Sequence, residues 1–212
     1  MQDGVVQPSE TADTARVRRT VLAVAGLNLA GFGVEVVVAF AIGSVALVAD
    51  SVDFLEDTAV NLLIALALGW PLARRALAGR AMAGIILLPA LAAAWQAVVK
   101  AGDPVPPDVW PLALTAGGAA LVNLTAALLL ARVRHHGGSL GRAAFLSARN
   151  DVAVNLAIIA MAGLTAWTGS GWPDIALGVG IVLLNGTAAV EVWRLAGEER
   201  LAARALAGEG AA

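Results

Sequence analysis

The residues of this chain that could do chemistry are carboxylates set within apolar sequence. One apolar stretch carries four acids within eight positions: Asp50, Asp53, Glu56 and Asp57. Residues three or four positions apart share one face of a helix, so most of these acids form a single stripe. That stripe comprises Asp50, Asp53, Asp57 and Asn61, and a similar one further along the chain comprises Ser147, Asp151 and Asn155.

Two such stripes that face each other would build a cation site. Asp53, Asp57 and Asp151 would then converge, with Ser147 or Asn150 as a neutral oxygen donor. A carboxylate-rich pocket made only of oxygen ligands suits hard or borderline divalent cations. Crowded carboxylates also hold protons and release them when a cation binds, which couples metal movement to proton movement. The spacing therefore predicts a metal site formed by Asp53, Asp57, Asp151, Ser147 and Asn150.

Composition indicates the surroundings of these acids. Of 212 residues, 59% are hydrophobic and 14% are charged, whereas a soluble domain is about 45–50% apolar and about 25% charged. This excludes an ordinary globular enzyme, and the low charge excludes disorder. The chain has no Cys, which excludes disulfides and thiolate metal sites, and its net charge of −2 gives no basic surface for nucleic acid. We expect an all-α integral membrane protein that is not an enzyme and needs no cofactor.

The apolar sequence divides into six stretches long enough to cross a bilayer, since each span needs about 20 residues. They lie at about Thr20–Ile42, Val45–Gly69, Arg80–Val99, Pro111–Ala131, Ala143–Trp167 and Trp172–Trp193. We therefore expect one six-helix transporter domain over 20–194, a cytoplasmic tail over 1–19 and a short cytoplasmic tail over 195–212.

The arginines support this count and set the orientation. With both termini inside, the cytoplasmic segments hold Arg16, Arg18, Arg19, Arg74, Arg75, Arg80, Arg132, Arg134, Arg142, Arg194, Arg200 and Arg204. On the outside there is only Lys100, as the positive-inside bias requires. The six Trp fall near the ends of the expected spans, as aromatic belts do. We expect a multi-pass protein of the cell membrane with cytoplasmic N- and C-termini.

Acids inside a bilayer are costly, on the order of 2.5–3.5 kcal/mol each at the bilayer centre, so these must face protein or water. Polar links between helices are the alternative reading, and it is the commoner role of the amides Asn28, Asn61, Asn123 and Asn155. Asp50 would equally suit a helix start near the outer interface. A structural or proton-handling role suits Glu56 better than metal ligation does. We assign Glu35, Asp50 and Glu56 to proton handling or an accessory role.

A short motif occurs twice. The segments that begin at Asp57 and at Asp151 both read D-x-A-V-N-L-x-I. Chance in a chain rich in Ala, Leu and Val is one explanation. The other is that spans one to three and four to six are copies, and three spans per copy would make the second copy inverted. Inverted repeats are a device of secondary transporters, whose site lies near mid-membrane at the repeat interface.

At these residues the chain resembles the cation diffusion facilitator family, also called the cation efflux family. The stretch from Gly43 to Asp57 is similar to that family's second span, where G-S-x-A-L-x-A-D-[AS] precedes [HD]-x-x-x-D. The first span, with Asn28 and Glu35, and the Gly171-Trp-Pro-Asp174 lead-in to the sixth also fit. The resemblance covers about residues 20–195.

The resemblance implies an antiporter that exports divalent transition-metal ions from the cytoplasm in exchange for protons, with metal ions, protons and the lipid bilayer as its partners. Asp53 and Asp57 match the family's second-span ligands, and Asp151 matches its fifth-span Asp. Ser147 stands where the family has His, and the loss of imidazole favours harder ions over zinc. Asn150 or water would complete the site.

Two further departures concern the segments outside the spans. The family's usual cytoplasmic metal-binding domain after span six, which supports dimerisation, is missing, so we expect a short form and leave a homodimer open. The loop between spans four and five is often His-rich in the family, whereas here it has only His135 and His136. A solvated linker is the simpler reading of that pair, and a weak metal-capture site is the other.

Two other functions remain open on the sequence alone. A proton-coupled transporter of an organic cation would use the same carboxylates, although an aromatic content of 5% with no Tyr makes a cation–π pocket sparse. A non-transporting membrane scaffold would leave the intramembrane acids unexplained. A hydrolase built from Ser147, His135 and Asp151 is the weakest reading, because no G-x-S-x-G turn surrounds the serine.

Overall fold

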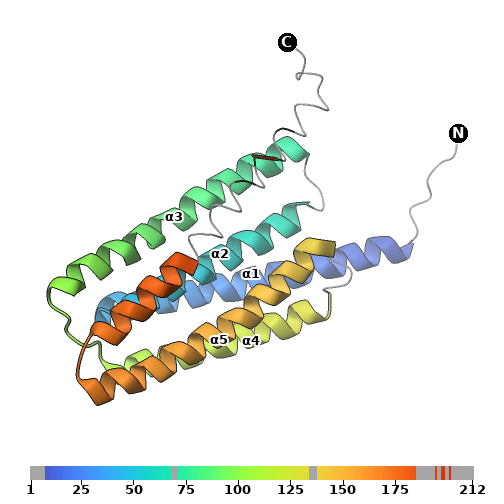
Figure 1. The fold of residues 1–212 in the computed structure, drawn as a ribbon. Helices are drawn as coiled ribbons and strands as arrows, with labels where there is room; N and C mark the ends of the chain where they lie inside the picture. Colours follow the sequence, from blue (N-terminus) through green and yellow to red (C-terminus); the bar gives the residue numbers. More distant parts are fainter. Residues whose placement is uncertain are drawn as a thin grey trace, which may run out of the picture.

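A computed structural model describes residues 8–67, 71–133 and 138–184, together with 194, 197–198 and 201. Every element in these ranges is helical (Figure 1). The long helices are α1 (Pro8–Ile42), α2 (Val45–Ala67), α3 (Leu72–Gly102), α4 (Val109–Ala131) and α5 (Gly138–Thr168). A shorter apolar helix, Trp172–Leu184, follows α5. The expected all-α class is confirmed for this part of the chain.

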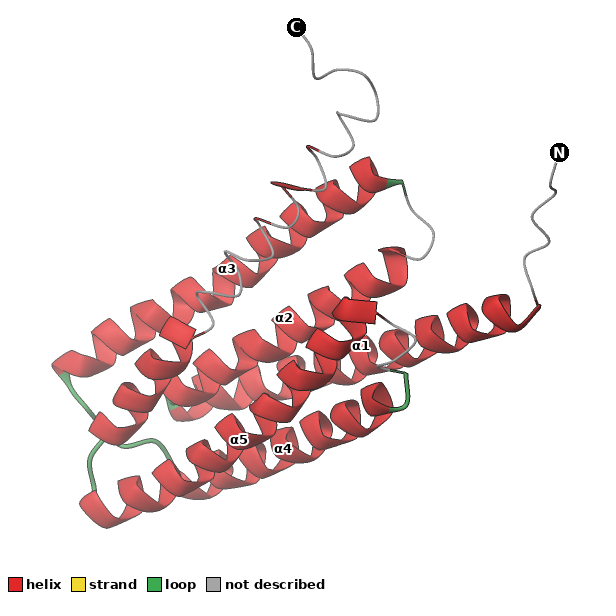
Figure 2. Cartoon of the chain, turned by 45° about the vertical axis from the view of Figure 1, so that its right-hand side comes forward, coloured by secondary structure: helices red, strands yellow, loops and turns green. Residues whose placement is uncertain are grey.

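The helices lie side by side as a bundle in which α2 has the most partners. α2 packs against α1, α3 and α5, while α4 packs against α1 and α5. The connections at 43–44, 103–108 and 169–171 lie together at one end of the bundle, while the start of α1 and the ends of α2 and α4 lie at the other (Figure 2). We call these the Asp174 end and the terminal end. The acidic stripe of α2 is thereby placed between α1 and α5.

Three of the expected spans are long and apolar enough to cross a membrane. They are Thr14–Ile42, Val109–Ala131 and Ala144–Thr168, while Trp172–Leu184 is apolar but shorter, as judged over the described residues. α2 has the required length, but four of its residues are acidic. The sequence prediction of a membrane protein is confirmed by these helices, and the full count of six spans stays a prediction.

Several helices are longer than the spans predicted from apolar sequence. α1 begins at Pro8 rather than Thr20, and α3 begins at Leu72 rather than Arg80. Both extensions lie at the terminal end, where residues such as Arg18 and Arg74 are exposed. The difference arises because Ala, Leu and Arg favour a helix whether it is in lipid or in water. Hydropathy marks the bilayer boundary, whereas the helix ends at a breaker such as Pro71.

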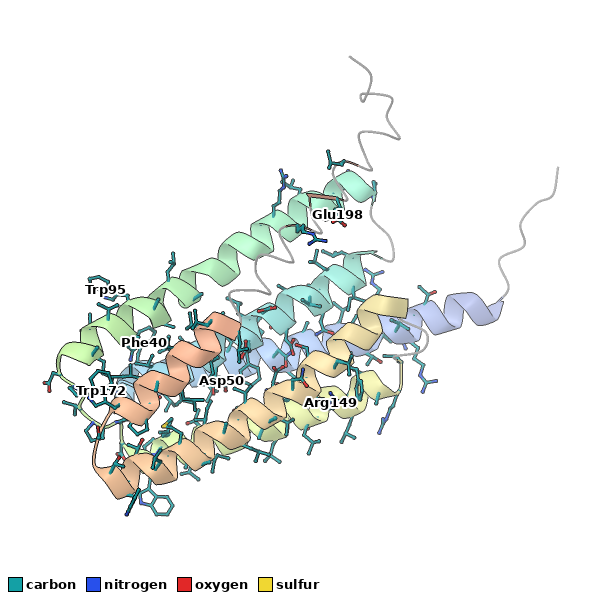
Figure 3. The ribbon with its side chains drawn as sticks, viewed as in Figure 1. Phe40, Asp50, Trp95, Arg149, Trp172 and Glu198 are labelled. Carbon is teal, nitrogen blue, oxygen red and sulfur yellow. The ribbon has the colours of Figure 1, made fainter. Side chains whose placement is uncertain are left out.

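The outside of the bundle is apolar, as expected for a surface in contact with lipid. Large side chains such as Val37, Leu114 and Leu183 are about two-thirds or more exposed. Four exposed tryptophans lie toward the Asp174 end, and two of them are labelled in Figure 3: Trp95, Trp110, Trp167 and Trp172. This is the pattern of an aromatic belt. Trp70 and Trp193, expected at other span ends, lie outside the described residues.

Candidate intramembrane carboxylate site

Asp57 lies at the meeting point of three helices. Its carboxylate accepts a hydrogen bond from Ser147 Oγ of α5 at 3.0 Å, and another from Asn28 Nδ2 of α1 at 3.3 Å. The Asp57 side chain is buried, and Ser147 is partly buried. The structure therefore brings together two residues of the predicted metal site from different stripes, and adds Asn28, for which the sequence suggested only a general interhelical role.

The two copies of the repeated motif use their asparagines in the same way. Asn61 Nδ2 donates to the backbone oxygen of Asp57 at 2.8 Å, and Asn155 Nδ2 donates to the backbone oxygen of Asp151 at 2.9 Å. In each helix the amide is thus held against the turn that carries the acid. Each asparagine is fully buried, and each Oδ1 lacks a hydrogen-bond partner among the residues that the structure describes. Two buried acceptors are therefore left beside the acids.

Asp151 completes the acidic region on the α5 side. It lies one turn after Ser147 on the same face, and 9% of its side chain is exposed. Its carboxyl is close enough to Asp57, Asp50 and Glu56 for the charge of each to act on it. The stripes of α2 and α5 therefore do face each other, as the packing of these two helices requires.

The other residues assigned to the site are placed less centrally. Asp53 and Glu56 are partly exposed on α2, and both interact with other groups. Asn150 is exposed and accepts a hydrogen bond from Arg149 at 3.4 Å. Among the described residues, no three His, Asp or Glu side chains converge closely enough to hold a metal ion. His135 and His136 lie outside the described residues.

Glu35 and Asp50 form a separate pair deeper in the bundle. Each is only 1% exposed, and Asp50 lies in the interior of the bundle, in the second turn of α2 from the Asp174 end (Figure 3). Their carboxyl groups lie next to each other, and the Asn155 side chain lies beside Asp50. None of the four carboxyl oxygens has a hydrogen-bond partner among the described residues. Two acids are therefore buried together, and no side chain that the structure describes donates to them.

Comparison with known families identifies the family to which this chain belongs. A model of the cation efflux transmembrane domain matches residues 21–198. The chain belongs to the cation efflux family. A search of curated proteins returned no match. The match covers α2 to α5 and α1 from residue 21 onward, including the acids of α1, α2 and α5, and it confirms the resemblance seen at Gly43–Asp57. This cation efflux protein is therefore a membrane protein with a cation-transport domain, and its family consists of transporters rather than enzymes.

A third group of polar residues in this cation efflux protein closes the Asp174 end. Asp174 is fully buried and accepts hydrogen bonds from Ser44 Oγ at 2.6 Å, Val45 N at 2.8 Å and Ala46 N at 3.2 Å. Ser44 Oγ also accepts from Leu47 N at 3.1 Å. The first free N–H groups of α2 are thus satisfied, partly by a residue of a different helix.

Lys100 supplies the positive charge of this group. Its Nζ lies 2.9 Å from Asp174 Oδ2 and also donates to the backbone oxygen of Gly43 at 2.6 Å. Lys100 therefore connects α3 to the start of α2 and to the helix Trp172–Leu184. It is the only cation that the sequence analysis expects on the outer side. Sequence reasoning missed this network. An acid just after Pro173 at a helix start is a recognisable signal for a capping role, but its partners are far apart in the sequence.

Two glycines allow the close approach of the backbones at this end. A Cβ on Gly171 would lie 2.6 Å from the backbone oxygens of Pro104 and Val105, and a Cβ on Gly178 would lie 2.7 Å from Val45. Gly171 N instead donates to Pro104 O at 2.8 Å. Such contacts leave no room for a side chain, so the Asp174 end is packed backbone against backbone.

Proposed function

We propose that this cation efflux protein exports a divalent metal cation from the cytoplasm in exchange for protons, through the carboxylates between α2 and α5. The observation that carries the proposal is the hydrogen bond between Ser147 and the buried Asp57, with Asp151 one turn away. A buried, oxygen-lined meeting point of two helices is what an intramembrane cation site requires, because a desolvated cation needs charged and neutral oxygens around it.

The proposed ligands are Asp53, Asp57 and Asp151, with Ser147 and Asn150 or water as neutral donors. Asp57 and Asp151 already lie close together. Rotation of the partly exposed Asp53 side chain would bring a third carboxylate to them. The site contains no imidazole or thiolate among its proposed ligands, so it favours hard or borderline divalent ions such as manganese over zinc.

Protons are the natural counter-ions of this site. When the cation leaves, the buried carboxylates are left with uncompensated negative charge in a poorly solvated region, and they take up protons to remove it. Cation binding then releases those protons. Binding from one side and release to the other would give an exchange of metal for protons.

The proposed architecture is a six-span inverted repeat. Its support is that α1 packs against α4 and α2 against α5, which are the equivalent helices of the two halves. The repeated Asp-to-Asn link of α2 and α5 adds to this support. In this arrangement the site lies at the interface of the repeats, and the terminal end faces the cytoplasm in a cell membrane.

Transport in proteoliposomes tests the proposal. Purified protein in sealed vesicles with an imposed pH gradient should move manganese, cobalt or zinc, and Asp57→Asn and Asp151→Asn should reduce the flux to the background of empty vesicles. Asp103→Asn is the matched control, because Asp103 is an exposed acid in the loop before α4. Full flux in both site variants would contradict the proposal, and so would flux of an organic amine that metals fail to inhibit.

A further inference from the structure

We propose that Glu35 and Asp50 form a second intramembrane site, distinct from the Asp57 site, whose ligand is a proton shared between the two carboxyl groups. Glu35 belongs to α1 and Asp50 to α2, so the site lies between two closely packed helices. Binding of this proton does not depend on the proposed metal transport, whereas its part in the exchange rests on the proposed function.

The burial of the pair decides its charge. Each side chain is 1% exposed, and the four carboxyl oxygens have no donor among the described residues. An isolated ionised carboxylate in such surroundings is very unfavourable, and two adjacent ones repel each other as well. One proton removes a charge and turns one oxygen into a donor. The second carboxyl then accepts a short, charge-assisted hydrogen bond.

The charged groups around the pair do not offer an alternative to a proton. Asp53 of α2 acts on Glu35, and the charge of Asp50 acts on Asp151 of α5, so the charged neighbours of the pair on both sides are acids. α4 has no charged residue, and Lys100 of α3 is bound to Asp174. Within the described part of the chain, no arginine or lysine side chain donates a hydrogen bond to the pair. Further negative charge nearby makes the protonated state more favourable still.

Asn155 gives an independent indication of a ligand at this point. It is fully buried beside Asp50, and its Oδ1 has no hydrogen-bond partner in the described part of the chain. A buried amide oxygen without a donor is costly, so it is normally paired. An O–H in the pair would supply a donor in the same buried region. Two carboxyls and one amide oxygen are too few for a divalent metal, which takes six or more oxygen ligands or retains water, but they suit a proton.

The position of Asn155 also connects this site with the metal site. Its Nδ2 is held by the backbone of Asp151, while the same side chain lies beside Asp50. A cation that binds at Asp57 and Asp151 would add positive charge on this side of Asp50. That charge favours the ionised form of the pair, so the shared proton would leave when the metal enters.

Infrared spectroscopy of the whole protein in lipid vesicles tests the proton directly. A protonated carboxyl gives a C=O stretching band separate from that of a carboxylate, and the band shifts in heavy water. We expect this band at neutral pH in the wild type. It should weaken by about one carboxyl per chain in Glu35→Gln and in Asp50→Asn, since the pair shares one proton.

Asp57→Asn is the matched control for the metal site and should keep the band of the pair. A band of unchanged intensity in both Glu35→Gln and Asp50→Asn would overturn the proposal. The variants are expected to fold, because each replaces a carboxyl by an amide of the same shape that can donate to the remaining acid. Circular dichroism should show wild-type helix content, and a loss of folding in both would also count against a neutral, proton-sharing pair.

Proton counting tests the part played in exchange. In proteoliposomes, Glu35→Gln should still bind the metal within a few-fold of wild type but release about one proton fewer per cation bound. The same proton release as in the wild type would overturn this part. If the wild type moved no metal at all, the proposed function would fail, whereas the infrared band of the pair would remain a separate and decisive result.

Discussion

The Asp174 end and the middle of the bundle both bury acids, but they treat them in opposite ways. Asp174 is fully buried with four donors, which come from Ser44, Val45, Ala46 and Lys100. Glu35 and Asp50 are almost as deeply buried, and no donor to either is found in the described ranges. The same type of group is thus paired in one region and left unpaired in another, within one small domain.

This difference separates structural acids from acids that handle ions. A buried carboxylate with a lysine and three further donors has its hydrogen bonds satisfied within the protein, so it serves to join its helices. A buried carboxylate without donors needs a proton or a cation, and its charge state changes when that ligand leaves. Asp57 is intermediate, with two donors from Ser147 and Asn28. We infer that stability depends most on the Asp174 end and ion exchange on the middle.

Removal of the Asp174 carboxylate should produce the largest loss of stability. Asp174→Ala leaves Lys100 and the first N–H groups of α2 without their acceptor, which should cost about 3–5 kcal/mol of unfolding free energy. Thermal unfolding in detergent, followed by circular dichroism, measures this. Asp103→Ala, at an exposed acid, is the control and should unfold like the wild type. Equal stability of the two variants would contradict the claim that the Asp174 hydrogen bonds stabilise the fold.

A side chain at Gly178 should be the next most damaging change. A Cβ there would lie 2.7 Å from Val45, and the atoms it meets include backbone. Gly178→Ala should therefore cost about 1–3 kcal/mol through forced displacement of α2. Gly180→Ala is the matched control, because a Cβ on Gly180 meets nothing within 4 Å. If both variants had the same melting temperature, the close packing of the Asp174 end would be contradicted.

The loss of one donor to Asp57 should have a moderate effect on cation binding and little on stability. Ser147→Ala removes the 3.0 Å hydrogen bond and a proposed neutral ligand. At about 0.5–1.5 kcal/mol for one such interaction, the metal dissociation constant should rise about 2- to 12-fold. Ser147→Thr keeps the hydroxyl and serves as the control. Unchanged affinity in the alanine variant would exclude Ser147 from the site.

The smallest effect on stability is expected where acids lack donors. Glu35→Gln and Asp50→Asn each remove a carboxyl group whose burial is unfavourable, and neither removes a stabilising hydrogen bond. Their melting temperatures at neutral pH should therefore equal or exceed that of the wild type. This is the reverse of the effect at Asp174. A drop in melting temperature comparable to that of Asp174→Ala would show that the pair stabilises the packing of its helices. The two regions would then not differ in the way described.

Part of this picture could be predicted from the sequence. Spacings of three and four positions predicted that Asp53, Asp57 and Asn61 share one helix face, and the motif at Gly43–Asp57 indicated the family that the domain match confirmed. The meeting of Ser147 with Asp57 follows from the expectation that the two stripes face each other. These features are local or depend on a single pairing of helices. The periodicity of the sequence is therefore sufficient to predict them.

Other features depend on contacts that no local pattern encodes. The Asp174 network joins residues 44–46, 100 and 174, and nothing in the sequence indicates which acid meets which helix start. The rotation of α5 about its own axis leaves Asn150 exposed next to Arg149, and an offset of one residue from Asp151 is enough for that. Hydropathy marks the apolar spans and not the helix starts, which lie earlier, at Pro8 for α1 and at Leu72 for α3.

The most direct test is calorimetric titration of the purified protein with manganese, cobalt and zinc, in two buffers of different ionisation enthalpy. The heat gives the affinity for each metal, and the difference between buffers gives the number of protons released. We predict binding with proton release in the wild type and in Asp103→Asn, and no binding heat in Asp57→Ala. Identical heats in the wild type and Asp57→Ala would contradict a cation site at these carboxylates.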